Sequence, residues 1–505
     1  MEKVIRRALV SVYHKEGLAE ILKLLHGQGV EFVSTGGTST FIEGLGYPCV
    51  AVEDLTKYPS MLGGRVKTLH PAIQGGILAR RGHETDQKEV LEYGLSLIDL
   101  VIVDLYPFEA TVASGASEED IIEKIDIGGI SLIRGAAKNF EDVVIIPSQA
   151  DYATLLEILR ERGARTTLEE RRHFARRAFA VSSHYDSAIF RYFDAEDHSA
   201  LRLTADEAKP LRYGENPHQK GVFYGDLDRY FEQLHGKELS YNNLQDVEAA
   251  VSLIQDFTEP TFAILKHNNA CGCASRPTLL EAWTDALAGD PVSAFGGVLV
   301  ANRPIDVATA REIDKLFLEV LIAPDFEAEA LTILEGKKNR ILLRQKEAID
   351  ARWSYRSMLG GVLAQETDRA VETTAEMKPV TKVAPTAEEL TDLVFATKLV
   401  KHSKSNAIVL GKGGQLIASG VGQTSRVDAL KQAIEKARHF GFDLKGAVLA
   451  SDAFFPFDDC VTLAAEAGIT AIAQPGGSVR DADSIAAADR LGVAMVMTGV
   501  RHFKH

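Results

Sequence analysis

The segment Gly63-Gly64-Arg65-Val66-Lys67-Thr68-Leu69-His70-Pro71 holds the residue types that bind a phosphate monoester. Its two glycines leave backbone N–H groups open to a close ligand. Arg65, Lys67 and the Thr68 hydroxyl follow directly. Amides of this kind form a concave anion site, and the two cations supply charge. A turn with solvated charges is the alternative for so short a motif.

Further residues of the same chemistry lie on either side of this segment. Lys15 follows an apolar run, and Ser34-Thr35-Gly36-Gly37-Thr38 precedes a predicted helix, so its amides face the positive end of the helix dipole. The predicted phosphate ligands here are Lys15, Ser34, Gly36, Gly37 and Thr38.

A third stretch of the first part predicts proton transfer. Asp126-Ile127-Gly128-Gly129 opens a helix that carries Lys138. Asp126 and Lys138 would form a proton-transfer pair if they shared a pocket. The alternatives are that Asp126 only caps the helix and that Lys138 is a solvated cation of the last turn. Tyr106 before Pro107 either packs at a strand end or donates to a developing oxyanion.

The second part of the chain has two polar segments of interest. Arg212-Tyr213 lies in a turn-rich segment and is able to clamp a phosphate and stack on a ring. Lys266-His267 follows an apolar run. A histidine at a strand end is usually structural, but a neighbouring cation favours the neutral imidazole that a general base needs.

The run His267-Asn268-Asn269-Ala270-Cys271-Gly272-Cys273 raises a zinc site, because histidine and cysteine are zinc ligands. The spacing is crowded, and the His-x-Glu and Cys-x-x-Cys motifs of a zinc deaminase are absent. We therefore predict no metal.

Short apolar runs alternate with helical patterns through the first ~195 residues, at 8–12, 30–34, 98–105 and 143–146. This order predicts a parallel sheet with helices on both faces, and ligands in such folds bind at the carboxyl ends of the strands. Helices are expected at 17–28 and 167–192.

Beyond a polar linker at 194–210, two stretches of the chain resemble each other. A second break near 367–387 separates two stretches that each contain an apolar run, a Lys-His pair and a nearby asparagine, at 263–268 and 400–406. Each stretch also has an apolar strand, at 292–300 and 447–452. We expect a duplicated α/β unit, with domains at 1–195, 205–366 and 385–505.

Composition limits the class of protein. A chain of 505 residues should form more than one domain. Its net charge of −15 disfavours general binding to nucleic acid or anionic membrane. The four scattered cysteines and the lack of a signal peptide or a bilayer-spanning run predict a cytoplasmic protein.

Taken together, the motifs resemble those of the bifunctional family that joins 5-aminoimidazole-4-carboxamide ribonucleotide (AICAR) formyltransferase to inosine monophosphate (IMP) cyclohydrolase. The resemblance runs from about residue 5 to the end. It rests on SVYHKEGL, STGGT, GGRVKTLHP, DLYPF, DIGGISLIRGAAKN, LRYGENPHQ, LKHNNACG, SNAIVL, SDAFFPFDD, QPGGS and RHFKH, in that order.

The resemblance implies a methylglyoxal-synthase-like parallel-sheet domain carrying the cyclohydrolase, followed by two cytidine-deaminase-like α/β units without zinc. It implies de novo purine biosynthesis, with AICAR, formyl-AICAR (FAICAR), IMP and the co-substrate 10-formyltetrahydrofolate as ligands, and a homodimer with transferase sites built from both subunits.

The resemblance also implies roles for single residues. The cyclohydrolase chemistry residues would be Lys67, Tyr106, Asp126 and Lys138, with nucleotide contacts from Lys15, Ser34, Gly36, Gly37, Thr38, Arg65, Thr68, Gly128 and Gly129. The formyltransferase chemistry residues would be Lys266, His267 and Asn406, with AICAR positioned by Arg212, Tyr213, Arg426, Asp481, Arg501 and Phe503.

Two other interpretations remain open at this point. The chain would be a nucleotide sensor if catalysis had been lost, because phosphate loops alone do not distinguish binding from turnover. Alternatively, the chain would be an enzyme in which only one half is active. The presence of Lys67, Asp126, Lys138, Lys266 and His267 favours the bifunctional enzyme, because a sensor need not keep them.

Overall fold

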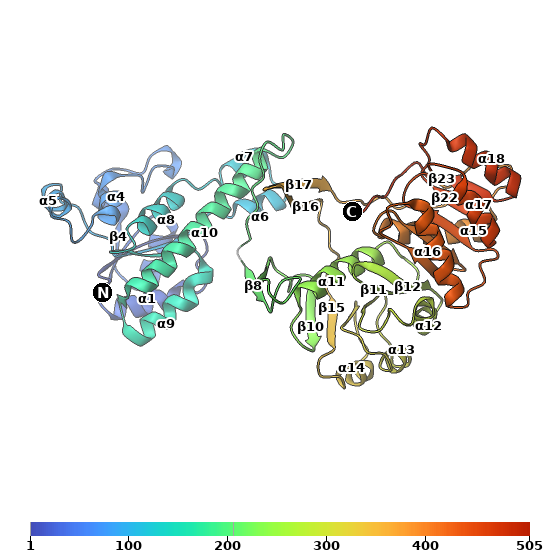
Figure 1. The fold of residues 1–505 in the computed structure, drawn as a ribbon. Coiled ribbons are helices and arrows are strands. Elements are labelled where there is room, and N and C mark those ends of the chain that lie inside the picture. Colours follow the sequence, from blue (N-terminus) through green and yellow to red (C-terminus); the bar gives the residue numbers. More distant parts are fainter. Residues whose placement is uncertain (1, 206) are drawn as a thin grey trace. The chain divides into compact units, whose positions relative to one another are not determined.

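The computed structural model describes residues 2–205 and 207–505. The chain divides into two compact units, 1–206 and 207–505. Figure 1 labels the elements of each unit.

The first unit is built on five parallel strands in the order β4-β3-β2-β5-β6. The strands are β2 (Arg7–Val12), β3 (Glu31–Ser34), β4 (Cys49–Ala51), β5 (Leu100–Asp104) and β6 (Val144–Ile146), with a small pair β1 (Lys3–Val4) and β7 (Arg165–Thr166). The helices are α1 (Leu18–Gly27), α2 (Gly36–Gly44), α3 (Val52–Thr56), α4 (Pro71–Leu78), α5 (Glu84–Glu92), α6 (Phe108–Ala113), α7 (Glu118–Ile122), α8 (Gly128–Lys138), α9 (Tyr152–Arg162) and α10 (Leu168–Phe193).

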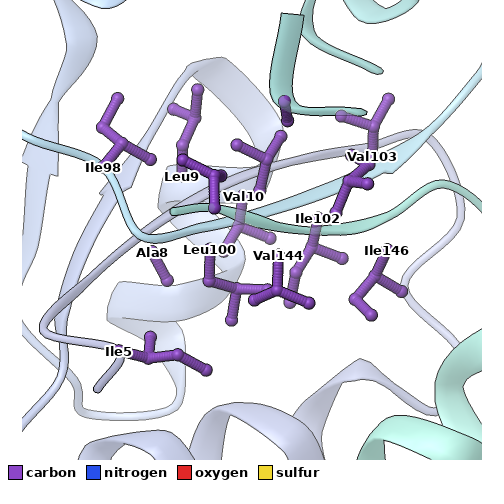
Figure 2. Packing of buried hydrophobic residues seen from close by; sticks show 14 of the residues in the cluster. Ile5, Ala8, Leu9, Val10, Ile98, Leu100, Ile102, Val103, Val144 and Ile146 are labelled. Atoms are coloured by element: carbon purple, nitrogen blue, oxygen red, sulfur yellow. The ribbon is translucent and has the colours of Figure 1, made fainter. Parts of the chain in front are cut away.

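The sheet of the first unit is buried on both faces. Successive residues of a strand point to opposite faces, yet Ala8, Leu9 and Val10 are all fully buried, as are residues 100–103 of β5. Figure 2 shows these side chains packed with Ile146 in one cluster. The predicted parallel sheet with helices on both faces is confirmed.

The second unit is built on a twelve-stranded sheet in the order β10-β15-β14-β13-β11-β12-β20-β19-β21-β22-β23-β18. These strands are β10 (Phe231–His235), β11 (Thr261–Lys266), β12 (Asn269–Ser275), β13 (Val298–Ala301), β14 (Val320–Ala323), β15 (Ile341–Gln345), β18 (Lys378–Pro379), β19 (Ile408–Lys412), β20 (Gln415–Gly420), β21 (Val448–Ser451), β22 (Ala471–Gln474) and β23 (Ala494–Met497). Two separate hairpins are β8 (Ala208–Leu211) with β9 (Gly221–Tyr224), and β16 (Trp353–Met358) with β17 (Gly361–Glu366).

Eight helices alternate with the strands of this sheet, in the same order in each half. They are α11 (Tyr241–Ile254), α12 (Leu279–Gly289), α13 (Val307–Ile313) and α14 (Ala328–Glu335), then α15 (Ala387–Lys401), α16 (Arg426–His439), α17 (Asp459–Ala467) and α18 (Asp481–Leu491). In each half, one helix precedes an antiparallel hairpin and a second helix follows it. Three further strands come next, and a helix connects each of them to the one after it.

The two halves therefore have the same topology. The order β12-β11-β13-β14-β15 matches β20-β19-β21-β22-β23, with the same parallel and antiparallel pairs. The likeness of each half to cytidine deaminases stays a prediction.

The predicted register of the repeat is wrong. Residues 263–268 form β11 and the turn after it, whereas 400–406 lie at the end of α15 and in the loop that follows. The counterpart of Lys266-His267 is Lys412-Gly413, because Lys266 pairs with Asn269 as Lys412 pairs with Gln415. The pairing of residues 292–300 with 447–452 is correct, since these segments contain β13 and β21.

Candidate active sites

The first site lies where β2, β3 and β5 end. The hydroxyl of Thr38 donates to the carbonyl of Val12 at 3.0 Å, and the hydroxyl of Ser34 donates to that of Val10 at 2.7 Å. Both side chains are buried, so the Ser34 hydroxyl joins β3 to β2 and the Thr38 hydroxyl joins α2 to β2, instead of facing a ligand. What this loop offers a ligand is the amides of Gly36 and Gly37, which are exposed at the start of α2.

Lys67 lies over those amides. A Cβ built on Gly36 would lie 3.5 Å from its Nζ, and one built on Gly64 would lie 2.5 Å from its Cε. Gly63 and Gly64 have φ values of 66° and 93°, which favour glycine. Among the described residues, no hydrogen bond or ion pair occupies the ammonium of Lys67. A free cation above the amino end of a helix is an anion site.

Two other predicted cations of this region, Lys15 and Arg65, are already engaged. Lys15 donates to the carbonyls of Val12 and Tyr13 at 2.9 and 2.8 Å, so it braces the loop after β2. Arg65 forms an ion pair with Glu123 at the surface. Either would have to exchange a partner to bind phosphate directly.

Asp126 begins the opposite wall of the site. Its Oδ1 accepts from the amide of Gly129 at 2.6 Å, which is a helix-capping contact. Burial raises the pKa of Asp126, as does the negative charge of Asp104, while the amides of Gly129 and Tyr106 oppose that rise. The Asp126 carboxyl therefore caps α8, and its raised pKa favours the protonated form, while its role in proton transfer stays a prediction.

Tyr106 and Thr68 complete this wall. Burial raises the pKa of Tyr106, and so do the charges of Asp126 and Tyr13, so its phenol stays a proton donor. The hydroxyl of Thr68 lies 3.0 Å from where a Cβ of Gly128 would be. Lys67, Thr68, Tyr106, Asp126 and the glycine amides are thus within one region.

Lys138 does not reach this region. It is exposed in the last turn of α8, ten residues after Gly128. At 1.5 Å per residue the two ends of the helix are about 15 Å apart. The structure therefore does not bring Lys138 to Asp126.

A small cavity adjoins the first site. Its volume is about 190 Å³, and Lys67, Tyr58 and His70 are among its lining residues. Lys67 is thus accessible from this side as well.

The second site starts at the turn between β11 and β12. His267 and Asn268 form a two-residue turn with φ values of 52° and 62°, the conformation of a type I′ hairpin. The amide of Asn268 donates to Asp246 of α11 at 2.6 Å. His267 is therefore held exposed at a hairpin tip and not at a plain strand end.

The repeat supplies an internal control for this turn. Gly413 and Gly414 form the equivalent tip between β19 and β20, with φ values of 57° and 66°. Their amides donate to Asp392 of α15 at 2.7 Å each. The aspartate and the turn are thus structural in both halves, and the histidine is the departure.

A second departure lies under the strands. The amide of Thr261 donates to the side chain of Asn302 at 2.8 Å. The amide of Ala407, its counterpart in the other half, donates to the side chain of Asp452 at 3.2 Å.

 In the first half the acceptor is a neutral amide, and the residue that opens the next helix is Leu279. In the second half the acceptor is a buried carboxylate, and the residue that opens the helix is Arg426. A charged pair has been placed in one copy only.

The charged pair organises Asn406. Arg426 forms an ion pair with Asp452, and its Nη2 donates to the Oδ1 of Asn406 at 2.9 Å. The other carboxylate oxygen of Asp452 accepts from the hydroxyl of Ser405 at 2.6 Å. Arg426 is 7% exposed, so it positions Asn406 from inside the protein.

The hairpin tip of the first half reaches this part of the second half. The amide of Lys404 donates to the Oδ1 of Asn269 at 3.0 Å. The ammonium of Lys266 donates to the carbonyl of Phe295 at 2.9 Å. The structure therefore brings Lys266, His267 and the loop of Asn406 to one edge of the sheet.

The chain terminus lies at the same edge. Ser405 donates its amide to the carbonyl of Lys504 at 2.9 Å, and His502 donates its amide to the carbonyl of Asp452 at 3.0 Å. The guanidinium of Arg501 lies 4.5 Å from the ring centre of Phe503, and both side chains are exposed. They form a cationic and aromatic pair facing solvent beside Asn406.

Three further predicted residues are Arg212, Tyr213 and Asp481. The guanidinium of Arg212 lies 5.6 Å from the ring centre of Tyr213. This loop is tied to α11, because Asn242 donates to the carbonyl of Glu215 at 3.2 Å, one turn before Asp246. Asp481 opens α18 and accepts the amide of Gly477 at 2.7 Å, and its buried Oδ1 has no hydrogen-bond partner within residues 2–205 and 207–505.

Sequence reasoning missed three residues that support the second site. Asp246 and Asp452 hold the hairpin tip and the Asn406 loop, and His502 is buried in the terminal segment. Asp452 falls within a quoted motif, but only the comparison of the two halves reveals its role. Nothing in the residue types around Asp246 or His502 would have revealed theirs.

In the described part of the chain, no group of three or more His, Cys, Asp or Glu side chains is arranged to hold a metal ion. Within the same residues, no helix has both the length and the apolar character needed to cross a membrane.

Known proteins are similar to this chain over its full length. The AICARFT/IMPCHase bienzyme family matches residues 136–436, and the MGS-like domain matches residues 17–131. The bifunctional purine biosynthesis protein PurH of Bacteroides thetaiotaomicron is 67% identical over 100% of this chain and 99% of its own. That of Chloroflexus aurantiacus is 48% identical over 100% of this chain and 99% of its own. The crystal structure of ForH resembles 37% of this chain, over 99% of that protein, at 34% identity with a TM-score of 0.33.

Family membership follows from the full-length match and establishes both activities. The chain belongs to the AICARFT/IMPCHase bienzyme family, and is an enzyme of purine biosynthesis that transfers the formyl group of 10-formyltetrahydrofolate to AICAR and cyclises the product FAICAR to IMP with loss of water.

Proposed function

We propose that the two activities are divided between the two units. Residues 1–195 would cyclise FAICAR, and the repeats at 205–366 and 385–505 would together transfer the formyl group. The observation that carries this division is the asymmetry of the repeat. Only the first half has a histidine at its hairpin tip, and only the second half has the buried Arg426–Asp452 pair; the hydrogen bond from Lys404 to Asn269 links the two segments.

In formyl transfer, the difficulty is that the amine of AICAR is conjugated to its ring and carboxamide and is a poor nucleophile. We assign His267 as the base that removes a proton from this nitrogen as it attacks the formyl carbon. The bond from that carbon to N10 of the folate then breaks, and the proton passes to N10. General base catalysis of this kind contributes on the order of 10²–10⁴ in rate.

Lys266 and Asn406 would act on the same reacting group. The Lys266 ammonium would stabilise the tetrahedral oxyanion, exchanging the Phe295 carbonyl for it. Asn406, with its oxygen held by Arg426, presents its amide N–H₂ toward the substrate. AICAR itself would be positioned by Arg212, Tyr213, Asp481, Arg501 and Phe503, and by the buried Arg426 through Asn406.

In cyclisation, the carboxamide nitrogen of FAICAR attacks its own formyl carbon, so orientation supplies much of the rate. We assign the unpaired Lys67 and the Tyr106 phenol to the carbinolamine oxyanion. Asp126, whose pKa burial raises, would carry the proton that leaves with the expelled water. The substrate would be held by Lys15, Arg65, Thr68 and the loops containing Ser34, Gly36, Gly37, Thr38, Gly128 and Gly129.

We propose a lesser role for Lys138 than for Lys67. Its exposed ammonium lies at the far end of α8, so a direct exchange of protons with Asp126 would need a different conformation.

We further propose a cytoplasmic homodimer whose transferase repeats are cytidine-deaminase-like without zinc. Four free cysteines support a reducing compartment.

The division of labour is tested with two substrates and two variants. Formyl transfer is followed by the ultraviolet absorbance of the tetrahydrofolate that it releases, and cyclisation is followed separately from FAICAR. Lys67→Met should abolish only cyclisation, and His267→Ala only formyl transfer. Loss of both activities in either variant would contradict the division.

A further inference from the structure

The last residues of the chain are held in place although they form no helix or strand. Between residues 498 and 505 no regular element is present. His502 is nevertheless buried, with 3% of its surface exposed, while its neighbours Arg501 and Phe503 face solvent. The side chain of His502 is therefore the anchor of this terminal segment.

The anchor is an ionic clamp. Nδ1 of His502 lies 2.6 Å from Oδ2 of Asp368, and Nε2 lies 2.9 Å from Oε1 of Glu372. Carboxylates only accept hydrogen bonds, so both ring nitrogens must donate, which requires the imidazolium. Asp368 and Glu372 belong to the segment after β17, far from the terminus in sequence.

Further charged groups surround the clamp. Lys401 at the end of α15 faces Asp368 and forms an ion pair with Asp256 at 2.9 Å. Asp256 also binds His402 at 2.7 Å. Lys504 lies close to Lys401, and burial lowers the pKa of Lys504. His502 is thus the cation that the two carboxylates share directly.

The clamp is connected to the transferase site through the backbone. The amide of His502 donates to the carbonyl of Asp452 at 3.0 Å. Two residues on, the amide of Lys504 donates to the hydroxyl of Ser405 at 3.0 Å, and its carbonyl accepts from the amide of Ser405. Displacing the terminal segment would move Arg501 and Phe503 and release the residue before Asn406.

We propose that His502, clamped between Asp368 and Glu372, is a positioning residue for formyl transfer that holds Arg501 and Phe503 against bound AICAR. This inference rests on the proposed function, since it takes AICAR as the ligand of Arg501 and Phe503. His502 itself touches no substrate and acts through its neighbours.

The test compares His502→Gln with Arg501→Ala and with a control, His439→Gln. His439 is exposed in the last turn of α16, thirteen residues beyond Arg426 and about 20 Å away along the helix. The KM for AICAR and kcat of formyl transfer are measured for each. His502→Gln should raise the KM for AICAR at least tenfold, change kcat less than threefold, and speed release of terminal residues by carboxypeptidase. His439→Gln should change none of these.

The outcomes separate the inference from the proposed function. If Arg501→Ala raises the KM but His502→Gln leaves it within twofold, the positioning role is wrong. If neither raises it, the AICAR role of the terminal segment fails and the inference fails with it. If His502→Gln does not fold, Glu372→Gln replaces it, because the amide keeps the shape of the side chain. An unchanged KM in that variant would then refute the proposal.

Discussion

The His502 clamp makes the stability of the second unit depend on pH. Burial alone would lower the pKa of His502, but the hydrogen bonds and charges of Asp368 and Glu372 outweigh it and raise the pKa to about 9. The ordinary value is 6.5. The folded protein therefore holds this proton more tightly than the unfolded chain does, and folding gains free energy wherever the folded form is protonated.

The magnitude and the pH range follow from these two values. A rise in pKa from 6.5 to about 9 corresponds to about 3 kcal/mol of stabilisation. This contribution is fully present below pH 6.5 and is lost progressively as the pH rises through 9. Three kcal/mol is about a fifth of the stability of a typical domain at the upper end of the range.

The assay uses tryptophan fluorescence, because the two tryptophans of the chain, Trp283 and Trp353, both lie in the second unit. The free energy of unfolding in urea is measured between pH 6 and 10 for the natural protein and for His502→Gln. Subtracting one curve from the other cancels the contributions of the titrating groups that the two proteins share. The difference should shrink by about 3 kcal/mol from the lowest to the highest pH. A difference that stays constant across this range would refute the charged clamp.

Three further predictions concern the two sites. Asp246→Ala frees the turn of His267 and should lower kcat of formyl transfer about tenfold. The equivalent Asp392→Ala should leave kcat of the folded enzyme unchanged. Equal losses of kcat in the two variants would refute a special role for the His267 tip. Lys138→Met should reduce cyclisation less than tenfold, against at least a hundredfold for Lys67→Met, and equal losses would place Lys138 in the site. Gly420→Ala puts a Cβ 1.8 Å from the carbonyl oxygen of Ala429 and should abolish formyl transfer while cyclisation continues. Gly361→Ala, whose Cβ meets only ordinary contacts, is the control. A matching loss of cyclisation in Gly420→Ala would show that the two units do not fold independently.

The first unit could be predicted from the sequence because its strands are buried on both faces. Such strands appear as unbroken apolar runs, and residues 100–103 are a clear example. The loops that follow the strands then had to meet at one edge. What the sequence could not show is how the polar groups of those loops are used. The Ser34 and Thr38 hydroxyls bind backbone carbonyls, and Arg65 binds Glu123.

The duplication was predicted, but its register was not, for a physical reason. The letters Lys-His recur at 266–267 and 401–402, and they suggested an alignment. The structure repeats backbone geometry instead. A two-residue hairpin turn needs positive φ at both positions, which glycine adopts without strain. Gly413 and Gly414 therefore fill the turn that His267 and Asn268 fill in the other half, and no sequence similarity marks the match.

The asymmetry of the repeat also explains why the second unit offers one site of this kind and not two. The tip formed by Gly413 and Gly414 carries no base. The guanidinium of Arg276 covers it, donating to the carbonyl of Gly413 at 2.6 Å and lying 3.4 Å from where a Cβ of Gly414 would be.

Arg276 is in turn held by Asp285 at 2.5 Å. An arginine paired on both sides closes that crevice, and the neutral Asn302 replaces the charged Asp452 beneath it. The His267 tip is instead kept exposed at a positive φ, a conformation that costs a non-glycine residue free energy. The imidazole of His267 is exposed at this tip, which supports the proposal that it acts in formyl transfer.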